Sequence, residues 1–193
     1  MEVPGKREIH FWLCLKWQQL WNRMASKPVS SNSAIKPYKV ALPVTSATNW
    51  EDKLYEDIRE NLQDIDGLIV GSPVYYAGPN GSLCAILDRV FYSCSDMLAY
   101  KPAAAIAVCR RGGASATIDR LNKYFTINNM PVVSSQYWNI IHGRLPGEAA
   151  QDAEGLQIMR TLGKNMAWLL KNIKAGAQPL PETEERQITN FIR

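Results

Sequence analysis

Two short segments of the chain carry residue types that could build a ligand site. The first follows the apolar run 68–71 and consists of Ser72, Pro73, Val74, Tyr75 and Tyr76, with Asn80 a little further on. The second follows the apolar run 102–109 and consists of Arg110, Arg111, Gly112, Gly113 and Ala114. Tyrosine rings offer faces for stacking, and glycine, which has no Cβ, lets backbone N–H groups approach a ligand closely. This combination indicates a pocket for a flat aromatic ligand and not a protease-like or metal site.

The elements that must position these segments alternate between strand and helix. Apolar runs predict strands over 67–71, 102–109 and 130–135, and helical spacing predicts helices over 51–62, 83–92, 114–128 and 152–172. Such alternation is typical of an α/β protein with a doubly wound parallel sheet. In that architecture ligands bind beyond the carboxyl ends of the strands, where both segments are expected to lie.

Composition limits the classes of protein that the chain can belong to. A length of 193 residues suits one domain, and a net charge of +4 without a basic cluster predicts no nucleic-acid partner. The four cysteines are widely spaced and form no C-x-x-C pair, so we expect no metal site and a reducing compartment. No apolar stretch is long enough to cross a membrane, and the run 9–15 lacks a cleavage pattern, which together predict a cytoplasmic protein.

The first part of the chain differs from the rest. It contains a possible helix over 9–24, a serine-rich stretch over 26–33 and a possible strand over 38–42. We therefore divide the chain into an atypical N-terminal segment, an α/β domain and a C-terminal extension, over 1–50, 51–175 and 176–193.

From about Asp52 to Lys171 the sequence resembles the flavodoxin-like family of NADPH-dependent FMN reductases, which is related to iron–sulfur flavoproteins and quinone reductases. The motifs that carry the resemblance lie at 71–76, 87–89, 109–114, 122–125 and 165–168. The resemblance implies a flavodoxin-like three-layer sandwich whose first one or two strands are not recognisable here. It also implies an FMN cofactor, NADPH or NADH as co-substrate, and a quinone, flavin or similar small molecule as electron acceptor. A homodimer is the expected assembly.

The resemblance also assigns the two segments to the flavin. One side of the isoalloxazine ring is expected against Ser72 to Tyr76 together with Asn80, and the pyrimidine side against Arg110 to Ala114. We expect one of the two arginines to face the site, where it would favour negative charge on the reduced flavin, and the other to be solvated. No catalytic side chain is predicted, because the flavin itself carries the chemistry.

The phosphate-binding loop of the family is not recognisable. Gly5 is the only glycine before Gly67, and the hydroxyl-rich stretch 30–33 is a weak substitute for a glycine-rich loop. The cysteine cluster of iron–sulfur members is also absent, so no iron–sulfur cluster is expected. The abrupt change near Asp52 suggests an altered reading frame or a truncation upstream.

Several alternatives stay open. The chain could be an impaired flavodoxin-like remnant without a phosphate anchor, or an electron-transfer flavodoxin, although such flavodoxins are usually acidic. Tyr75 and Tyr76 could stack on a ring or pack beside a helix, and the segment 137–139 could line the site or contact a second subunit.

For other residues with potentially reactive side chains, a structural role is the preferred interpretation. We expect Cys109 to be a core residue at a strand end, and Cys84 and Cys94 to be helix packing. His142 is expected to be structural or solvated, and Asp88–Arg89 to be a surface pair or an anchor for a loop. Helical spacing predicts that Met159, Met166 and Trp168 all lie in the core.

Overall fold

The fold is taken from a computed structural model that describes residues 53–176, 178–182, 184–185 and 187–189. The expected helix 9–24, strand 38–42 and serine-rich stretch lie outside the described residues, as does Cys14. The described elements are α2 (Lys53–Leu62), β1 (Leu68–Tyr75), β2 (Gly78–Pro79), α3 (Gly81–Ser93), α4 (Ser95–Leu98), β3 (Ala103–Cys109), α5 (Ala114–Ile127), β4 (Ile140–His142), the 3-10 helix η2 (Glu148–Gln151) and α6 (Ala153–Gly176).

The described strands form one sheet in the order β2-β1-β3-β4. β1 runs parallel to β3, with Leu68 opposite Ala103, and β3 runs parallel to β4, with Cys109 opposite His142. β2 is a short antiparallel partner of β1 and forms a hairpin with it. The predicted α/β class with a parallel sheet is confirmed, and the carboxyl ends of β1, β3 and β4 all lie at one edge.

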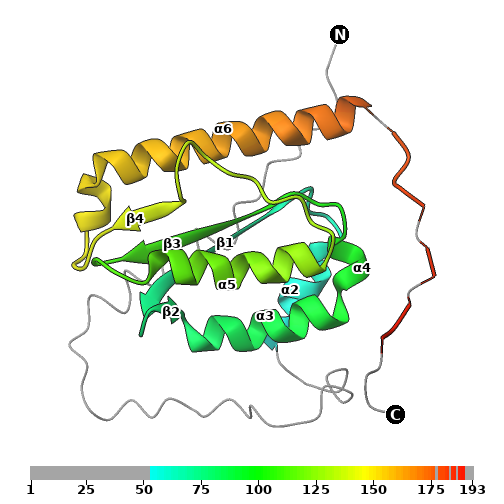
Figure 1. The fold of residues 1–193 in the computed structure, drawn as a ribbon, viewed down its shortest axis with the longest axis horizontal. Coiled ribbons are helices and arrows are strands. Elements are labelled where there is room, and N and C mark those ends of the chain that lie inside the picture. The colour runs from blue at the N-terminus through cyan, green and yellow to red at the C-terminus, as the bar shows by residue number, and fades with distance from the viewer. Residues whose placement is uncertain (1–52, 177, 183, 186, 190–193) are drawn as a thin grey trace.

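Helices cover both faces of the sheet. Figure 1 shows α6 along one face and α3 and α5 along the other. β3 is lined by small side chains that alternate between the two sides: Ala103, Ala105 and Ala107 belong to the larger core beneath α3 and α5. Ala104 and Ile106 instead pack with Leu162 and Met166 of α6. Small residues on both faces of β3 allow the two helical layers to approach the sheet closely.

Three predicted helices are confirmed with small changes at their ends, and the helix expected over 51–62 is described from Lys53. The predicted inner faces of α3 and α5 are also correct, since Leu83, Leu87 and Val90 are buried, as are Leu121 and Phe125. Among the described residues, no helix is long and apolar enough to cross a membrane.

Trp168 is the exception on α6. It was expected in the core, yet it is 67% exposed, whereas Leu162 and Met166 are buried. Successive helical residues are about 100° apart, so Trp168 lies about 200° from Met166 around the helix. Trp168 therefore lies off the face of α6 that packs on the sheet.

The first correction to the predicted strands concerns β1. We expected the strand to end at Gly71, but it continues through Ser72 and Pro73 to Tyr75. The Leu68 N–H bonds the Pro102 carbonyl of the β3 side, so alternate residues of β1 face β3. Leu68, Val70 and Ser72 therefore direct their backbone N–H groups towards β3. Pro73 lies between these positions, so its lack of an N–H removes no hydrogen bond to β3.

The second correction concerns 130–135, which is not a strand. Its contact with the sheet is an isolated bridge between Val132 and Ala103, and the third parallel strand is Ile140–His142 instead. Between the two, the Asn139 side chain donates to the Ala105 carbonyl at 3.0 Å. A buried side-chain amide thus occupies the position in the ladder that a backbone N–H would otherwise fill.

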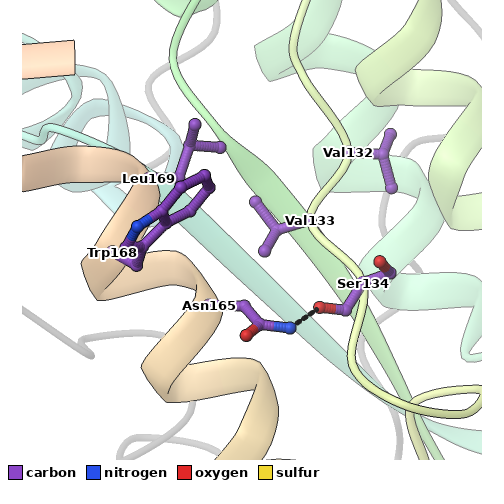
Figure 2. A pocket seen from close by; sticks show the side chains of 6 residues that line it. All are labelled: Val132, Val133, Ser134, Asn165, Trp168 and Leu169. Carbon is purple, nitrogen blue, oxygen red and sulfur yellow. Dashed lines mark hydrogen bonds between the residues drawn. The ribbon is translucent and has the colours of Figure 1, made fainter. Parts of the chain in front are cut away.

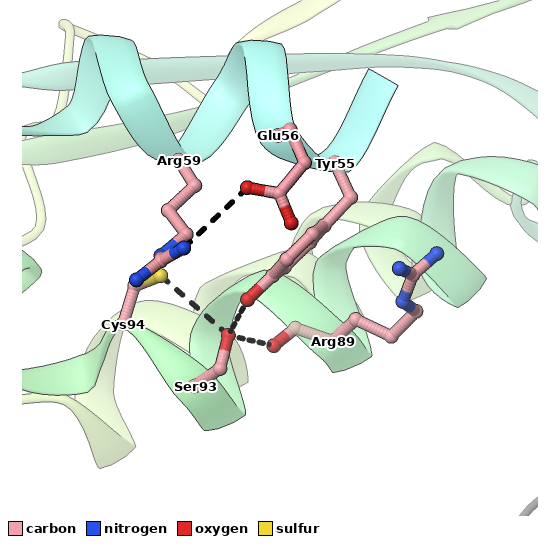
Figure 3. Close-up of polar contacts among 6 residues, drawn as sticks. All are labelled: Tyr55, Glu56, Arg59, Arg89, Ser93 and Cys94. Carbon is pink, nitrogen blue, oxygen red and sulfur yellow. Dashed lines mark hydrogen bonds and ion pairs between the residues drawn. The ribbon is translucent and has the colours of Figure 1, made fainter. Parts of the chain in front are cut away.

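Side-chain contacts hold α3 to its neighbours on both sides. Figure 3 shows the α2 side, where the Tyr55 hydroxyl lies 2.6 Å from Ser93 Oγ. The Arg89 guanidinium lies over the Tyr55 ring, 4.6 Å from its centroid. On the α5 side, Asp88 accepts a hydrogen bond from the Tyr124 hydroxyl.

Asp88 and Arg89 therefore interact with different helices and do not form the expected surface pair. Arg120 completes the α5 contact, with Nη2 lying 3.6 Å from Asp88 Oδ1. Burial, and then the Asp88 carboxylate, raise the pKa of the Tyr124 phenol, so this hydroxyl stays protonated and donates.

Candidate functional site

The two segments singled out in the sequence meet at the carboxyl edge of the sheet. A Cβ placed on Gly113 would lie 2.5 Å from Ala77 Cα and 2.9 Å from Val74 Cγ1. Gly113 also has a φ of 88°, in the left-handed region that favours glycine. The loop after β3 is therefore packed directly on the β1–β2 hairpin, and this contact requires glycine for two independent reasons.

The tip of that hairpin has an unusual backbone. Tyr75 pairs with Gly78, which leaves Tyr76 and Ala77 as a two-residue turn with φ values of 49° and 59°. Both central residues are left-handed, as in a type I′ turn, although neither is glycine or asparagine. A left-handed residue with a Cβ costs about 1–2 kcal/mol. Tyr76 is fully exposed, so its ring is not packed beside a helix.

Ser72 and Asn80 hold the base of the hairpin. Ser72 is buried, and its Oγ accepts the Asn80 N–H at 2.9 Å and donates to the Pro73 carbonyl at 2.8 Å. Asn80 Oδ1 accepts the Leu83 N–H at 3.0 Å and so caps the N-terminus of α3. Within the protein these two side chains position the hairpin and begin the following helix.

The N-terminus of α5 has no side-chain cap from its N-cap residue. Its N-cap residue is Gly113, which offers no side chain to the first backbone N–H groups. The first N–H groups of a helix have no intrahelical partner, and the helix dipole makes this end partly positive. Arg110 and Arg111 are exposed beside it, and a Cβ on Gly112 would meet nothing within 4 Å. This edge therefore suits an electron-rich or anionic group.

A third loop, over 143–148, joins the same edge. The Gly143 N–H donates to the Cys109 carbonyl at 3.0 Å, which places this loop beside the end of β3. Glu148 accepts the N–H groups of Leu145 and Arg144 at 2.9 and 2.7 Å. These hydrogen bonds, followed by the positive charges of Arg144 and Arg110, lower the pKa of the Glu148 carboxyl.

At the end of β4, Asp152 contacts His142. Asp152 Oδ2 accepts the His142 N–H at 2.7 Å and lies 3.5 Å from His142 Nδ1. Sequence reasoning missed Glu148 and Asp152. The available signal for Asp152 was its position just before the amphipathic stretch that forms α6, where acidic caps are common.

The three described cysteines are buried or half-buried, which fits the expected packing roles. Cys109 and Cys94 are buried, and Cys84 is half-buried on α3. Burial raises the pKa of the Cys109 and Cys84 thiols, which disfavours the reactive thiolate. Within the described part of the chain, no group of three or more His, Cys, Asp and Glu side chains could hold a metal ion.

A pocket of about 340 Å³ lies elsewhere, between the 132–134 segment and α6 (Figure 2). Asn165 crosses it and donates to the Ser134 carbonyl at 2.8 Å, and the exposed Trp168 forms one wall. The Val133 N–H bonds the Ala103 carbonyl, so the pocket adjoins the amino end of β3. The loops described above lie at the carboxyl end, about 20 Å away at 3.3 Å per residue. This pocket is therefore separate from the candidate site.

Comparison with known proteins assigns the chain to a family. The profile of the NADPH-dependent FMN reductase family matches residues 32–144, which is more than half of the chain. The chain belongs to the NADPH-dependent FMN reductase family. The match begins upstream of Asp52, so family similarity extends further towards the N-terminus than the motifs alone indicated.

Among curated relatives, an iron–sulfur flavoprotein of Methanocaldococcus jannaschii is 34% identical over 127 residues, covering 62% of this chain and 66% of that protein. A second iron–sulfur flavoprotein of the same organism is 31% identical, over 54% of this chain and 59% of the relative. The chain thus spans about two thirds or less of the length of these two relatives.

Solved structures support the fold. The Trp repressor binding protein of Bacillus subtilis matches with a TM-score of 0.50 at 22% identity, covering 56% of this chain and 74% of that one. RosB with a bound intermediate, 8-demethyl-8-formylriboflavin-5'-phosphate, matches with a TM-score of 0.51 at 12% identity, covering 81% of this chain and 73% of its own. The flavodoxin-like α/β fold is confirmed.

The ring side of an FMN site fits the residues at this edge. A Cβ on Gly112 would meet nothing within 4 Å, the N-cap residue of α5 makes no side-chain hydrogen bond to its first N–H groups, and the hairpin exposes Tyr75 and Tyr76. The serine stretch considered for the phosphate lies outside the described residues. The absence of an iron–sulfur cluster stays a prediction.

Proposed function

We propose that the protein is an FMN-dependent oxidoreductase that takes reducing equivalents from NADPH or NADH and passes them to a quinone, a flavin or a similar small acceptor. Family membership supports flavin-dependent oxidoreduction in general. The observation that carries the proposal is the packing of Gly113 on Val74 and Ala77, which joins two loops at the carboxyl edge of a parallel sheet. In α/β sheets this edge is where nucleotide cofactors bind.

The chain's own residues supply binding and electrostatics. One side of the ring lies against Ser72, Pro73, Val74, Tyr75, Tyr76 and Asn80, and the pyrimidine side lies against Arg110, Arg111, Gly112, Gly113 and Ala114. The backbone N–H groups at the start of α5 hydrogen-bond the ring, and an arginine favours negative charge as the ring is reduced. FMN held by these residues would supply the redox chemistry, which is hydride acceptance from the nicotinamide and electron delivery to the acceptor.

Two further features belong to the same proposal. A homodimer fits the exposed aromatic pair Tyr137 and Trp138, whose ring centroids lie 5.0 Å apart just before the edge strand β4. Light scattering on the purified protein measures this assembly directly. A cytoplasmic location fits Cys84, Cys94 and Cys109, which are all free thiols.

Titration with FMN, followed by flavin fluorescence, tests the cofactor. We expect saturable quenching, then oxidation of NADPH or NADH when benzoquinone is added to the loaded protein. Failure to bind FMN would favour the impaired remnant. Binding without nicotinamide oxidation would favour an electron-transfer flavodoxin, and either result overturns the proposal.

A further inference from the structure

His142 occupies the end of β4, next to the candidate flavin site. It stands in register with Cys109, the last residue of β3, and Arg110 and Arg111 follow immediately. Its side chain is 55% exposed, so the imidazole is accessible from solvent at this edge. A molecule that approached the ring between the loops after β3 and β4 would pass this imidazole.

Asp152 holds the His142 backbone and lies beside its imidazole. Asp152 Oδ2 binds the His142 backbone N–H at 2.7 Å and lies 3.5 Å from Nδ1, while Oδ1 accepts the Gly155 N–H at 2.9 Å. A Cβ on Gly155 would lie 2.5 Å from Asp152 Oδ2 and 3.2 Å from the Ile140 carbonyl. The carboxylate is therefore seated in a space that exists only because residue 155 is glycine.

The charges around this pair favour an ionised carboxylate. Hydrogen bonds from the Gly155 and His142 N–H groups lower the pKa of Asp152. The other charged groups of this loop cluster are Glu148, Arg144 and Arg110, and Glu148 is bound to the backbone N–H groups of its own loop. Asp152 Oδ2 faces His142 Nδ1 at 3.5 Å, and Nε2 is left without a partner among the described residues.

We propose that His142 donates a proton from Nε2 to the bound electron acceptor, a quinone or another carbonyl compound, and that Asp152 is its positioning residue. The inference rests on the proposed function. Reduction of a quinone to a hydroquinone takes two electrons and two protons. Two electrons and one proton originate in the reduced nicotinamide as a hydride equivalent. The second proton leaves the imidazolium as its Nε2–H bond breaks and an O–H bond forms, and solvent then reprotonates the imidazole.

The cysteine and the two arginines at the end of β3 are poorer acids for that step. The Cys109 thiol is buried, and burial raises its pKa. Arg110 and Arg111 carry guanidinium groups, which do not release protons near neutral pH. His142 is the only histidine in the described part of the chain, and the sequence has one other, His10.

The kinetic test uses the FMN-loaded His142→Gln variant and measures flavin reduction and flavin reoxidation separately. Reduction of the flavin by NADPH should stay within about threefold of wild type. Reoxidation by benzoquinone should slow by about 10²–10⁴-fold, the usual contribution of a general acid. Reoxidation by ferricyanide, which takes electrons without protons, should be unchanged. Asp152→Asn, which keeps a helix-capping side chain, should slow the benzoquinone step by about tenfold and spare ferricyanide.

The second test needs no cofactor. With two histidines in the chain, ¹H–¹⁵N spectra of the imidazoles can be assigned by comparing wild type with His142→Gln. We expect neutral His142 to carry its proton on Nδ1 and to lose this preference in Asp152→Asn. Glu154→Gln, an exposed change on α6 near Asp152, is the matched control and should leave the tautomer unchanged.

The outcomes distinguish this inference from the proposed function. If FMN does not bind or NADPH does not reduce it, both fail. If FMN is bound and reduced but His142→Gln reacts with benzoquinone as fast as wild type, the role of His142 alone is overturned. A wild-type His142 protonated on Nε2 would overturn the positioning role of Asp152.

Discussion

Substituting Gly113 by alanine should separate the two loops that form the candidate site. The new Cβ would lie 2.5 Å from Ala77 Cα and 2.9 Å from Val74 Cγ1, at a residue whose φ is 88°. The left-handed backbone costs about 1–2 kcal/mol for a residue with a Cβ. Crowding in a packed region adds about 1–3 kcal/mol. The sum, about 2–5 kcal/mol, is a large share of the roughly 5–15 kcal/mol that stabilises a typical domain.

Gly112→Ala is the matched control, one residue away. A Cβ on Gly112 would meet nothing within 4 Å, and its backbone is not among the positive-φ glycines. Such a substitution is close to neutral and can stabilise by about 0.4–1 kcal/mol through the unfolded state. Both variants add one methyl group. Only in Gly113→Ala does that methyl group meet the hairpin and sit on a left-handed residue.

Urea unfolding of the FMN-free variants measures these free energies, and FMN titration measures the site. We expect Gly113→Ala to unfold at lower urea and to bind FMN about tenfold more weakly, because the two loops would no longer pack together beside the ring. Gly112→Ala should keep or slightly raise its urea midpoint. Equal midpoints for the two variants would refute the packing of this loop on the hairpin.

The remaining predictions concern residues outside that contact. Tyr124→Phe should lower the free energy of unfolding by about 1 kcal/mol, because Asp88 loses its hydroxyl donor, as thermal denaturation would measure. Asp152→Ala should cost about 1 kcal/mol at pH 7 through loss of the cap of α6. The folded-state pKa of Asp152 lies below its usual 3.8, so this cost should persist above about pH 4 and shrink at lower pH. Urea titrations from pH 7 to 3 check the trend, and a cost that grows on acidification contradicts it. Trp168→Ala should change stability by less than about 0.5 kcal/mol because the side chain is 67% exposed, and chemical denaturation measures it. Phe125→Ala, in the core, should cost about 3–5 kcal/mol.

The elements with regular periodicity were predictable from the sequence. β3 and α5 were located within a residue or two, because an unbroken apolar run and helical spacing report burial directly. Gly112 and Gly113 also stood out as a glycine pair after a strand. What the pair could not reveal is which glycine matters. That depends on contact with Ala77, a residue on a different loop.

Two parts of the fold depend on interactions that no local pattern contains. The apolar run at 130–135 looks like a strand, but the sheet continues with Ile140–His142 because the Asn139 amide satisfies the Ala105 carbonyl. The turn at Tyr76 and Ala77 lacks the Asn-Gly type of sequence that usually signals a left-handed pair. The position of the third parallel strand and the conformation of this turn could be predicted only once the neighbouring strand is known.

The ring side of the candidate site is shaped mainly by backbone and not by side chains. The left-handed pair at Tyr76 and Ala77 is unfavourable by itself, so its geometry must be imposed by the strand pairing below it and by Gly113 packed against it. The start of α5 likewise presents N–H groups, which any residue except proline would supply. Because the backbone supplies much of the ring side, a side chain on the neighbouring strand can serve the acceptor. His142, held by Asp152 at the end of the neighbouring strand, is the side chain best placed to do so.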